Sequence, residues 1–197
     1  MGKLVAFESV TLDGVMQAPG RPDEDTRDGF AHGGWAAPYA DHVTMGLAGE
    51  GGETTGAMLF GRRTYEDFAG FWPHQGDNPF TALLNATPKY VASTSLREPL
   101  PWENSVLLEG DVPAAVGRLK QELDGDLLVL GSGALLRSLV SEGLVDTFLL
   151  LIHPLVLGSG QRLFEHGLPR TPFELVDTKT STTGVIIATL ARGGAAR

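Results

Sequence analysis

Short apolar runs alternate with amphipathic stretches along most of the chain, and each run has the length of a strand. The predicted strands cover residues 3–10, 57–60, 89–93, 105–108 and 126–130. Between them, apolar residues recur with the spacing of one helix face. The predicted helices run from about 38 toward 49, from 62 to about 71, from 111 to 123 and from 133 to 143. Strands that alternate with helices are typical of an α/β protein.

Individual residues mark the ends of two of these helices. Asp111 has the side chain of an N-cap, and Gly143 stands where a C′ glycine ends a helix. Residues 11–37 interrupt the alternation as one long loop rich in Gly, Pro and Asp. Long ordered loops in compact domains tend to be lids or binding loops.

The last third of the chain predicts the middle and one side of the sheet. Residues 145–152 are apolar at nearly every position, which predicts a central strand buried on both faces. Residues 173–181 and 184–192 predict two antiparallel strands joined at Thr182 and Thr183. The chain is therefore predicted to form a single α/β domain over residues 1–197. Its mixed sheet is mostly parallel and ends in a C-terminal antiparallel hairpin.

Composition narrows the function classes. With 42% hydrophobic residues, a chain of 197 residues can bury a full core. The net charge of −9, from 15 basic and 24 acidic residues, argues against nucleic acid or an anionic membrane as the partner. There is no cysteine, and the five histidines lack metal-ligand spacing, so no metal site is predicted. No apolar run approaches transmembrane length, and we expect a soluble, cytoplasmic protein.

Two glycine turns carry the candidate chemistry. Gly61, Arg62, Arg63 and Thr64 follow one predicted strand, and the Gly-Ser-Gly turn at 131–133 follows another. Each turn opens a helix, whose free backbone N–H groups favour an anion. Two arginines in a first helical turn oppose the helix dipole, which suggests a compensating anion. Paired cradles suit a dinucleotide with a 2′-phosphate, although either turn could also be an ordinary polar turn.

Other residues modify this interpretation. Ser93, Thr94 and Ser95 end a further strand and would add hydroxyl donors, and Arg97 could add a charge. The late glycine turn has Leu136 where the full Rossmann fingerprint requires Gly or Ala, which argues against a Rossmann domain.

Taken together in chain order, the motifs of this sequence resemble those of the dihydrofolate reductase-like superfamily. The chain is most similar to the branch that includes the reductase domain of the riboflavin-biosynthesis enzyme RibD. The motifs that carry the resemblance lie at residues 11–14, 59–66, 89–93, 131–136, 154–160 and 162–164.

The resemblance implies a three-layer fold, NADPH as cofactor and reduction of a heterocycle. The residues that it assigns to the adenosine phosphates are Gly61, Arg62, Arg63, Thr64, Ser93, Thr94 and Ser95. Those that it assigns to the pyrophosphate are Gly131, Ser132, Gly133, Ala134 and Leu135. The loop at 13–18, with Asp13 and Gly14, would cover the nicotinamide. The branch is commonly dimeric, so we expect a homodimer, and the apolar run at 185–187 could need cover beyond the domain.

Asp41 is the candidate catalytic residue. Dihydrofolate reductases place a carboxylate on the helix after the nicotinamide loop, shortly after Trp and Pro, and Trp35, Pro38 and Asp41 are similar with one extra residue. Asp41 would then bind a pterin-like ring and assist its protonation. The alternative is an exposed acid in the first helical turn, stabilised by the helix dipole. The loop at 17–35 is acidic, which makes it a poor partner for the ribose phosphate of RibD-type substrates.

Three functional hypotheses follow. The first is an NADPH-dependent reductase of a pterin, pyrimidine or related heterocycle. The second is a nucleotide-binding protein of the same fold without catalytic activity. The third is a structural or interaction domain whose glycine turns bind nothing.

Overall fold

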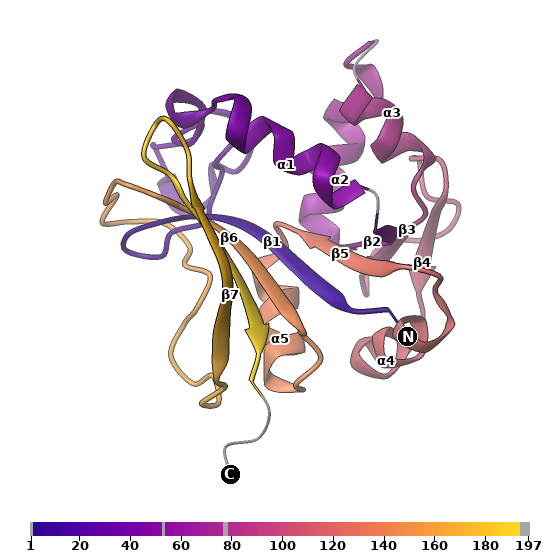
Figure 1. The fold of residues 1–197 in the computed structure, drawn as a ribbon. Coiled ribbons are helices and arrows are strands. Elements are labelled where there is room, and N and C mark those ends of the chain that lie inside the picture. The colour runs from indigo at the N-terminus through magenta and orange to yellow at the C-terminus, as the bar shows by residue number, and fades with distance from the viewer. Residues whose placement is uncertain (1, 53, 77–78, 194–197) are drawn as a thin grey trace.

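The computed structural model describes residues 2–52, 54–76 and 79–193, and these form one eight-stranded sheet (Figure 1). The strand order is β4-β3-β2-β5-β1-β6-β8-β7. The strands are β1 (Leu4–Thr11), β2 (Thr55–Gly61), β3 (Lys89–Ala92), β4 (Ser105–Leu108), β5 (Asp126–Leu130), β6 (Thr147–His153), β7 (Phe173–Thr180) and β8 (Ile186–Arg192). The first six strands in this order are mutually parallel, and β8 is antiparallel to both β6 and β7. The predicted α/β fold, mostly parallel with a C-terminal hairpin, is confirmed.

Helices cover both faces of this sheet (Figure 1). The helices are α1 (His42–Gly52), α2 (Arg62–Phe71), α3 (Pro79–Ala86), α4 (Val112–Glu122) and α5 (Gly133–Ser141), with short 3-10 turns at Arg27–Gly29, Ala37–Tyr39 and Trp72–His74. The largest apolar cluster packs α4 and α5 against one face. Two further clusters pack α2 with α3, and α1, against the other. Within the described residues, no helix is long and apolar enough to cross a bilayer.

The predicted burial of the 145–152 segment on both faces is confirmed. Phe148 and Leu150 of β6 join the cluster under α4 and α5, while Leu149 and Leu151 join the one under α1. Strand β6 lies inside the sheet between β1 and β8. Alternate side chains of a strand point to opposite faces, so a strand covered on both sides must be apolar throughout.

Helix α1 corrects two expectations. It begins at His42 rather than near Pro38, because residues 37–39 form a separate 3-10 turn and Ala40 is extended. It also covers part of the apolar run at 185–187, since Val185 and Ile187 are buried against Leu47. That run therefore needs no second chain to cover these two residues.

Helix α3 was not predicted from the sequence, whereas two predicted helix ends are confirmed. Helix α3 occupies a stretch for which the sequence analysis assigned no element, although its apolar residues have helical spacing. Asp111 caps α4 by accepting the Ala114 N–H at 2.8 Å. Gly143 follows α5 with a φ of 68°, as expected of a C′ glycine.

Candidate functional site

The parallel strands bring the predicted binding segments to one edge of the sheet. Strands β3, β2, β5 and β1 are consecutive in the sheet order and parallel, so their carboxyl ends lie side by side. The four predicted binding segments follow these strands. In sheet order they are residues 93–95, 61–64, 131–135 and 13–18. Ligands of open α/β sheets bind at this carboxyl edge.

The two glycine turns are hydrogen-bonded to each other. The Gly61 N–H donates to Ser132 Oγ at 3.0 Å, and the Ser132 N–H donates to Thr64 Oγ1 at 3.1 Å. Ser132 has a left-handed φ of 61°, and the preceding Gly131 has a φ of 59°. A Cβ atom on Gly131 would lie only 3.1 Å from Thr64 Cγ2. The glycine at 131 therefore serves both its backbone conformation and the close approach of the two turns.

Both helices that open from these turns keep their N-terminal amides free of side-chain caps. Gly61 is the N-cap of α2 and Ser132 that of α5, and within the described residues neither N-cap side chain makes a capping hydrogen bond. A Cβ atom on Gly61 would lie 3.7 Å from Leu135 Cβ, so the first turn of α5, which also holds Ala134, is close to the start of α2. The positive ends of two helix dipoles thus lie together at the sheet edge.

Arg62 and Arg63 both lie exposed in the first turn of α2. Arg62 forms an ion pair with Glu66 one helical turn later, at 3.5 Å, with both side chains nearly half exposed. Such exposed pairs contribute little, so Glu66 holds Arg62 only weakly. Within the described part of the chain, Arg63 has no acidic partner. Two cations thus stand beside the paired helix ends in a chain of net charge −9.

The turn after β3 is organised by its own hydroxyl group. Ser93 Oγ accepts the N–H groups of Ser95 at 3.1 Å and Leu96 at 3.0 Å. Thr94 and Ser95 are exposed. Arg97, whose charge the sequence analysis considered, instead donates to the Leu96 carbonyl of its own turn at 2.9 Å. The exposed hydroxyls are thus the donors that this turn offers to a ligand.

The loop after β1 is anchored through Asp13. The Asp13 carboxylate accepts the Thr11 hydroxyl at 2.6 Å and the N–H groups of Leu157 at 3.2 Å and Gly158 at 2.9 Å. The Thr11 hydroxyl, followed by these amides, lowers the pKa of Asp13 to about 2. Gly14 forms the turn itself, with a φ of 79°. Asp13 therefore ties this loop to residues 157–162, and its carboxylate is already occupied by protein donors.

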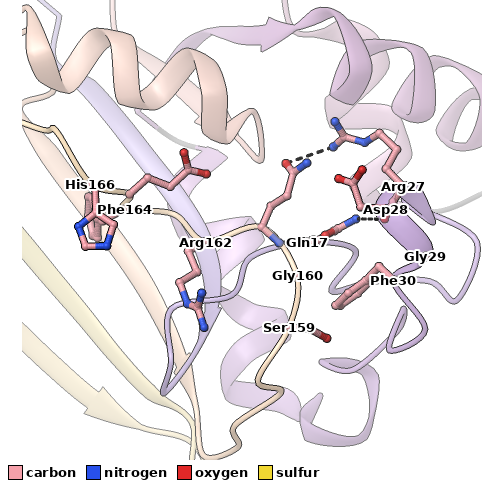
Figure 2. Close-up of a pocket in the computed structure, with 12 residues that line it drawn as sticks. Gln17, Arg27, Asp28, Gly29, Phe30, Ser159, Gly160, Arg162, Phe164 and His166 are labelled. Atoms are coloured by element: carbon pink, nitrogen blue, oxygen red, sulfur yellow. Dashed lines mark hydrogen bonds between the residues drawn. The ribbon is translucent and has the colours of Figure 1, made fainter.

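Two further side chains of this loop mark its position. A Cβ on Gly133 would lie 2.5 Å from Met16 Sδ, so Met16 rests on the first residue of α5. Gln17 accepts the Gln161 N–H at 2.9 Å and donates to the Arg27 carbonyl at 3.2 Å. Gln17 and Arg27 line an open hollow between this loop and the 159–166 segment, which has a volume of about 930 Å³; Figure 2 shows its lining side chains. Met16 lies in the 13–18 loop predicted from the sequence, but only the fold brings it to α5.

Asp41 is engaged by protein donors through both carboxylate oxygens. One oxygen accepts the Thr44 N–H at 2.9 Å, which makes Asp41 the N-cap of α1. The other accepts the N–H and the hydroxyl of Thr182, both at 2.6 Å, from the turn between β7 and β8. The Thr182 hydroxyl and these amides hold the pKa of Asp41 well below its usual range. The contacts favour the helix-cap interpretation, and the catalytic role of Asp41 stays a prediction.

Glu8 is a buried acid that sequence reasoning passed over. Its side chain is 3% exposed and shares a face of β1 with Leu4, Ala6 and Val10. Its Oε1 is buried and has no hydrogen-bond partner in the described part of the chain, and burial raises the pKa of this carboxyl well above its ordinary value. A glutamate at an inward position of an apolar strand was the signal that could have identified it.

Comparisons with known proteins identify the family of this chain. The RibD C-terminal domain family matches residues 2–187. The Bacillus subtilis protein YyaP is 29% identical over 134 residues, which cover 66% of this chain and 70% of YyaP. Another Bacillus subtilis protein, YwjB, is 25% identical over 182 residues, which cover 90% of this chain and 91% of YwjB.

Solved structures share the fold at lower identity. A protein from Shewanella sp. PV-4, assigned to riboflavin biosynthesis, has a TM-score of 0.70 at 19% identity, over 98% of this chain and 99% of its own. Dihydrofolate reductase from Enterococcus faecalis, solved with NADP(H), has a TM-score of 0.58 at 14% identity, over 98% of both chains. Likeness at these identities shows a common fold, and function has to be argued from the site.

Proposed function

The chain belongs to the RibD C-terminal domain family, and we propose that it is an NADPH-dependent reductase of a small heterocyclic compound. Direct hydrogen bonding between the two glycine turns supports this most strongly. It sets two uncapped helix N-termini and two exposed arginines beside each other, which suits a ligand with several phosphates. A dinucleotide carrying a 2′-phosphate is such a ligand.

The chain's own residues would bind and orient this cofactor. The 61–64 and 93–95 turns would hold the adenosine 2′-phosphate, through arginine, hydroxyl and backbone donors. The 131–135 turn would hold the pyrophosphate at the N-terminus of α5. Residues 13–18 would cover the nicotinamide, with Asp13 fixing the loop through its contacts to residues 157–158. When bound, NADPH supplies a hydride, and the protein supplies orientation and exclusion of water.

The test is a comparison of NADPH and NADH binding in the native protein and in arginine variants. Arg63→Ala should weaken NADPH binding by about 10- to 150-fold, since a hydrogen bond to a charged group contributes about 1.5–3 kcal/mol. NADH lacks the 2′-phosphate, so its affinity should be nearly unchanged. Arg62→Ala should cost less, because Arg62 also pairs with Glu66.

Arg118→Ala is the matched control, because it removes the same charge from an exposed position on α4. It should leave both affinities unchanged. Native protein that binds NADPH and NADH equally well would overturn the assignment of the arginines to the 2′-phosphate.

One observation favours the second hypothesis, a nucleotide-binding protein without catalytic activity. Both oxygens of Asp41 accept hydrogen bonds from protein groups, so this acid is not poised to give a proton. Steady NADPH oxidation in the presence of a heterocyclic acceptor would distinguish a reductase from a binder. Tight NADPH binding without oxidation across pterin and aminopyrimidine acceptors would favour the binder.

We also propose that the protein forms a homodimer through β7. This edge strand exposes Leu175 and Val176, which are 60% and 65% accessible. Unpaired edge strands and exposed apolar pairs are common contact surfaces. Light scattering at micromolar concentration should give twice the monomer mass for the native protein. The variant Val176→Lys should give the mass of a single monomer.

A further inference from the structure

A second hollow lies on the face of the sheet that is opposite to the face covered by α5, near the end of β5. It is a cavity of about 110 Å³ on the sheet face that carries α1 and α3 (Figure 1), at the seam between two apolar clusters. Its apolar lining includes Val5, Phe7, Leu128, Leu130 and Leu149 of the sheet, with Leu83 of α3 opposite them. A cavity of this scale holds a single apolar ring.

Strand register makes the floor of this cavity flat and continuous. Leu130, Phe7 and Leu149 are paired across β5, β1 and β6 and form one row. Leu128 and Val5 form a parallel row two residues away. Three strands span about 10 Å, and two residues along a strand span about 7 Å. The floor is therefore an apolar platform on which a planar ring can lie flat.

The cavity has one end at the proposed cofactor site and its polar groups at the other. Leu130 is the last residue of β5 and directly precedes Gly131. Among the described residues, the polar lining groups are Thr54, Thr55 and Asp126, at the start of β2 and β5. Asp126 accepts the Lys3 N–H at 2.8 Å. The four steps from Asp126 to Leu130 separate these two ends by about 13 Å.

We infer that this cavity binds the acceptor, and that the acceptor is an uncharged planar ring without a phosphate or carboxylate group on the bound part. The assignment of this cavity to the acceptor rests on the proposed reductase function. A ring on the Leu130–Phe7–Leu149 row would lie beside the turn proposed to hold the cofactor. Apolar contact with the leucine and phenylalanine side chains would supply the binding, and the walls from α1 and α3 would exclude water.

Charge is what this cavity selects against. An ionised group moved from water onto the apolar floor loses its hydration and finds no hydrogen-bond donor on that floor, which is costly. This cost disfavours a phosphorylated pyrimidine and favours a neutral aromatic heterocycle.

The test uses pyrazine, a neutral planar single-ring heterocycle, and pyrazine-2-carboxylate, which adds one negative charge to the same ring. Equilibrium dialysis with the full chain, without NADPH, gives each affinity. We expect pyrazine to bind at least tenfold more tightly than the carboxylate. Leu149→Trp fills the cavity and should abolish binding. Leu83→Trp fills it from α3, in case the first variant does not fold. Val106→Trp on the exposed edge strand β4 is the matched control and should bind as the native protein does.

Each outcome has a defined consequence. Pyrazine-2-carboxylate that binds as tightly as pyrazine, no pyrazine binding, or unchanged pyrazine binding in the folded filled variants would each overturn the inference. Failure of NADPH to bind while pyrazine still occupies the cavity would instead overturn the proposed reductase function and leave the ring site standing.

Discussion

Glu8 gives the sharpest stability prediction, because its Oε1 is buried without a hydrogen-bond partner among the residues that the structure describes. Glu8→Met keeps a side chain of similar length and removes both oxygens. A buried unsatisfied polar group costs about 1–3 kcal/mol. For a chain of this size each kcal/mol shifts the melting temperature by about 2–4 °C. At pH 8 we therefore expect the variant to melt at least about 2 °C above the native protein.

The dependence on pH distinguishes this explanation from general packing effects. Burial raises the pKa of Glu8 in the folded state above its value in the unfolded chain. Above pH 4.5 the unfolded chain releases this proton while the folded chain keeps it, so native stability falls as pH rises. Below pH 4.5 Glu8 is protonated in both the folded and the unfolded chain, so this pH-dependent loss of native stability vanishes. The gain from Glu8→Met should therefore grow between pH 4.5 and 8.

Thermal melts and urea titrations of both proteins at pH 4.5, 6 and 8 measure this. Glu109→Met is the control, because Glu109 is exposed and the substitution should produce no such trend. A variant that is less stable than the native protein at pH 8, or a gain that is equal at all three pH values, would show that Glu8 has a partner or stays ionised.

Three further perturbations test other parts of the structure. Gly131→Ala should lower the melting temperature by about 2–8 °C, since a left-handed φ costs a non-glycine residue roughly 1–2 kcal/mol and the new Cβ approaches Thr64; a melting temperature unchanged from native would argue against the close turn. Asp41→Asn should loosen the start of α1 and the turn at Thr182, seen as faster amide exchange there; if exchange is unchanged while NADPH oxidation stops, Asp41 is catalytic. Burial lowers the pKa of His153 below its ordinary value of 6.5. The native protein should therefore lose stability as the pH falls below 6.5, and His153→Gln should lose less stability over the same range. An equal change of unfolding free energy with pH in urea titrations of the two proteins would contradict this.

Much of the fold could be predicted from local pattern. Alternation and apolar runs identified all eight strands, because strand burial leaves its period in the sequence. The start of α1 could not be placed, since whether residues 37–39 continue into the helix depends on the extended residue Ala40. The central strand was predicted correctly because residues 148–152, covered on both faces, are apolar at five consecutive positions.

The sequence by itself determined which segments offer donors to an anion, because a glycine turn between a strand and a helix has the same local chemistry in any context. Only the tertiary structure decided that two such turns meet. Gly61 and Ser132 are 71 residues apart, and parallel pairing of β2 with β5 brings the Gly61 nitrogen within 3.0 Å of Ser132 Oγ. Likewise, Asp13 and Asp41 are ordinary acids in the sequence. They become anchors because residues 157–158 and 182, more than 140 positions away, place hydrogen-bond donors on them. Contacts of such separation arise from strand order, which local periodicity does not encode.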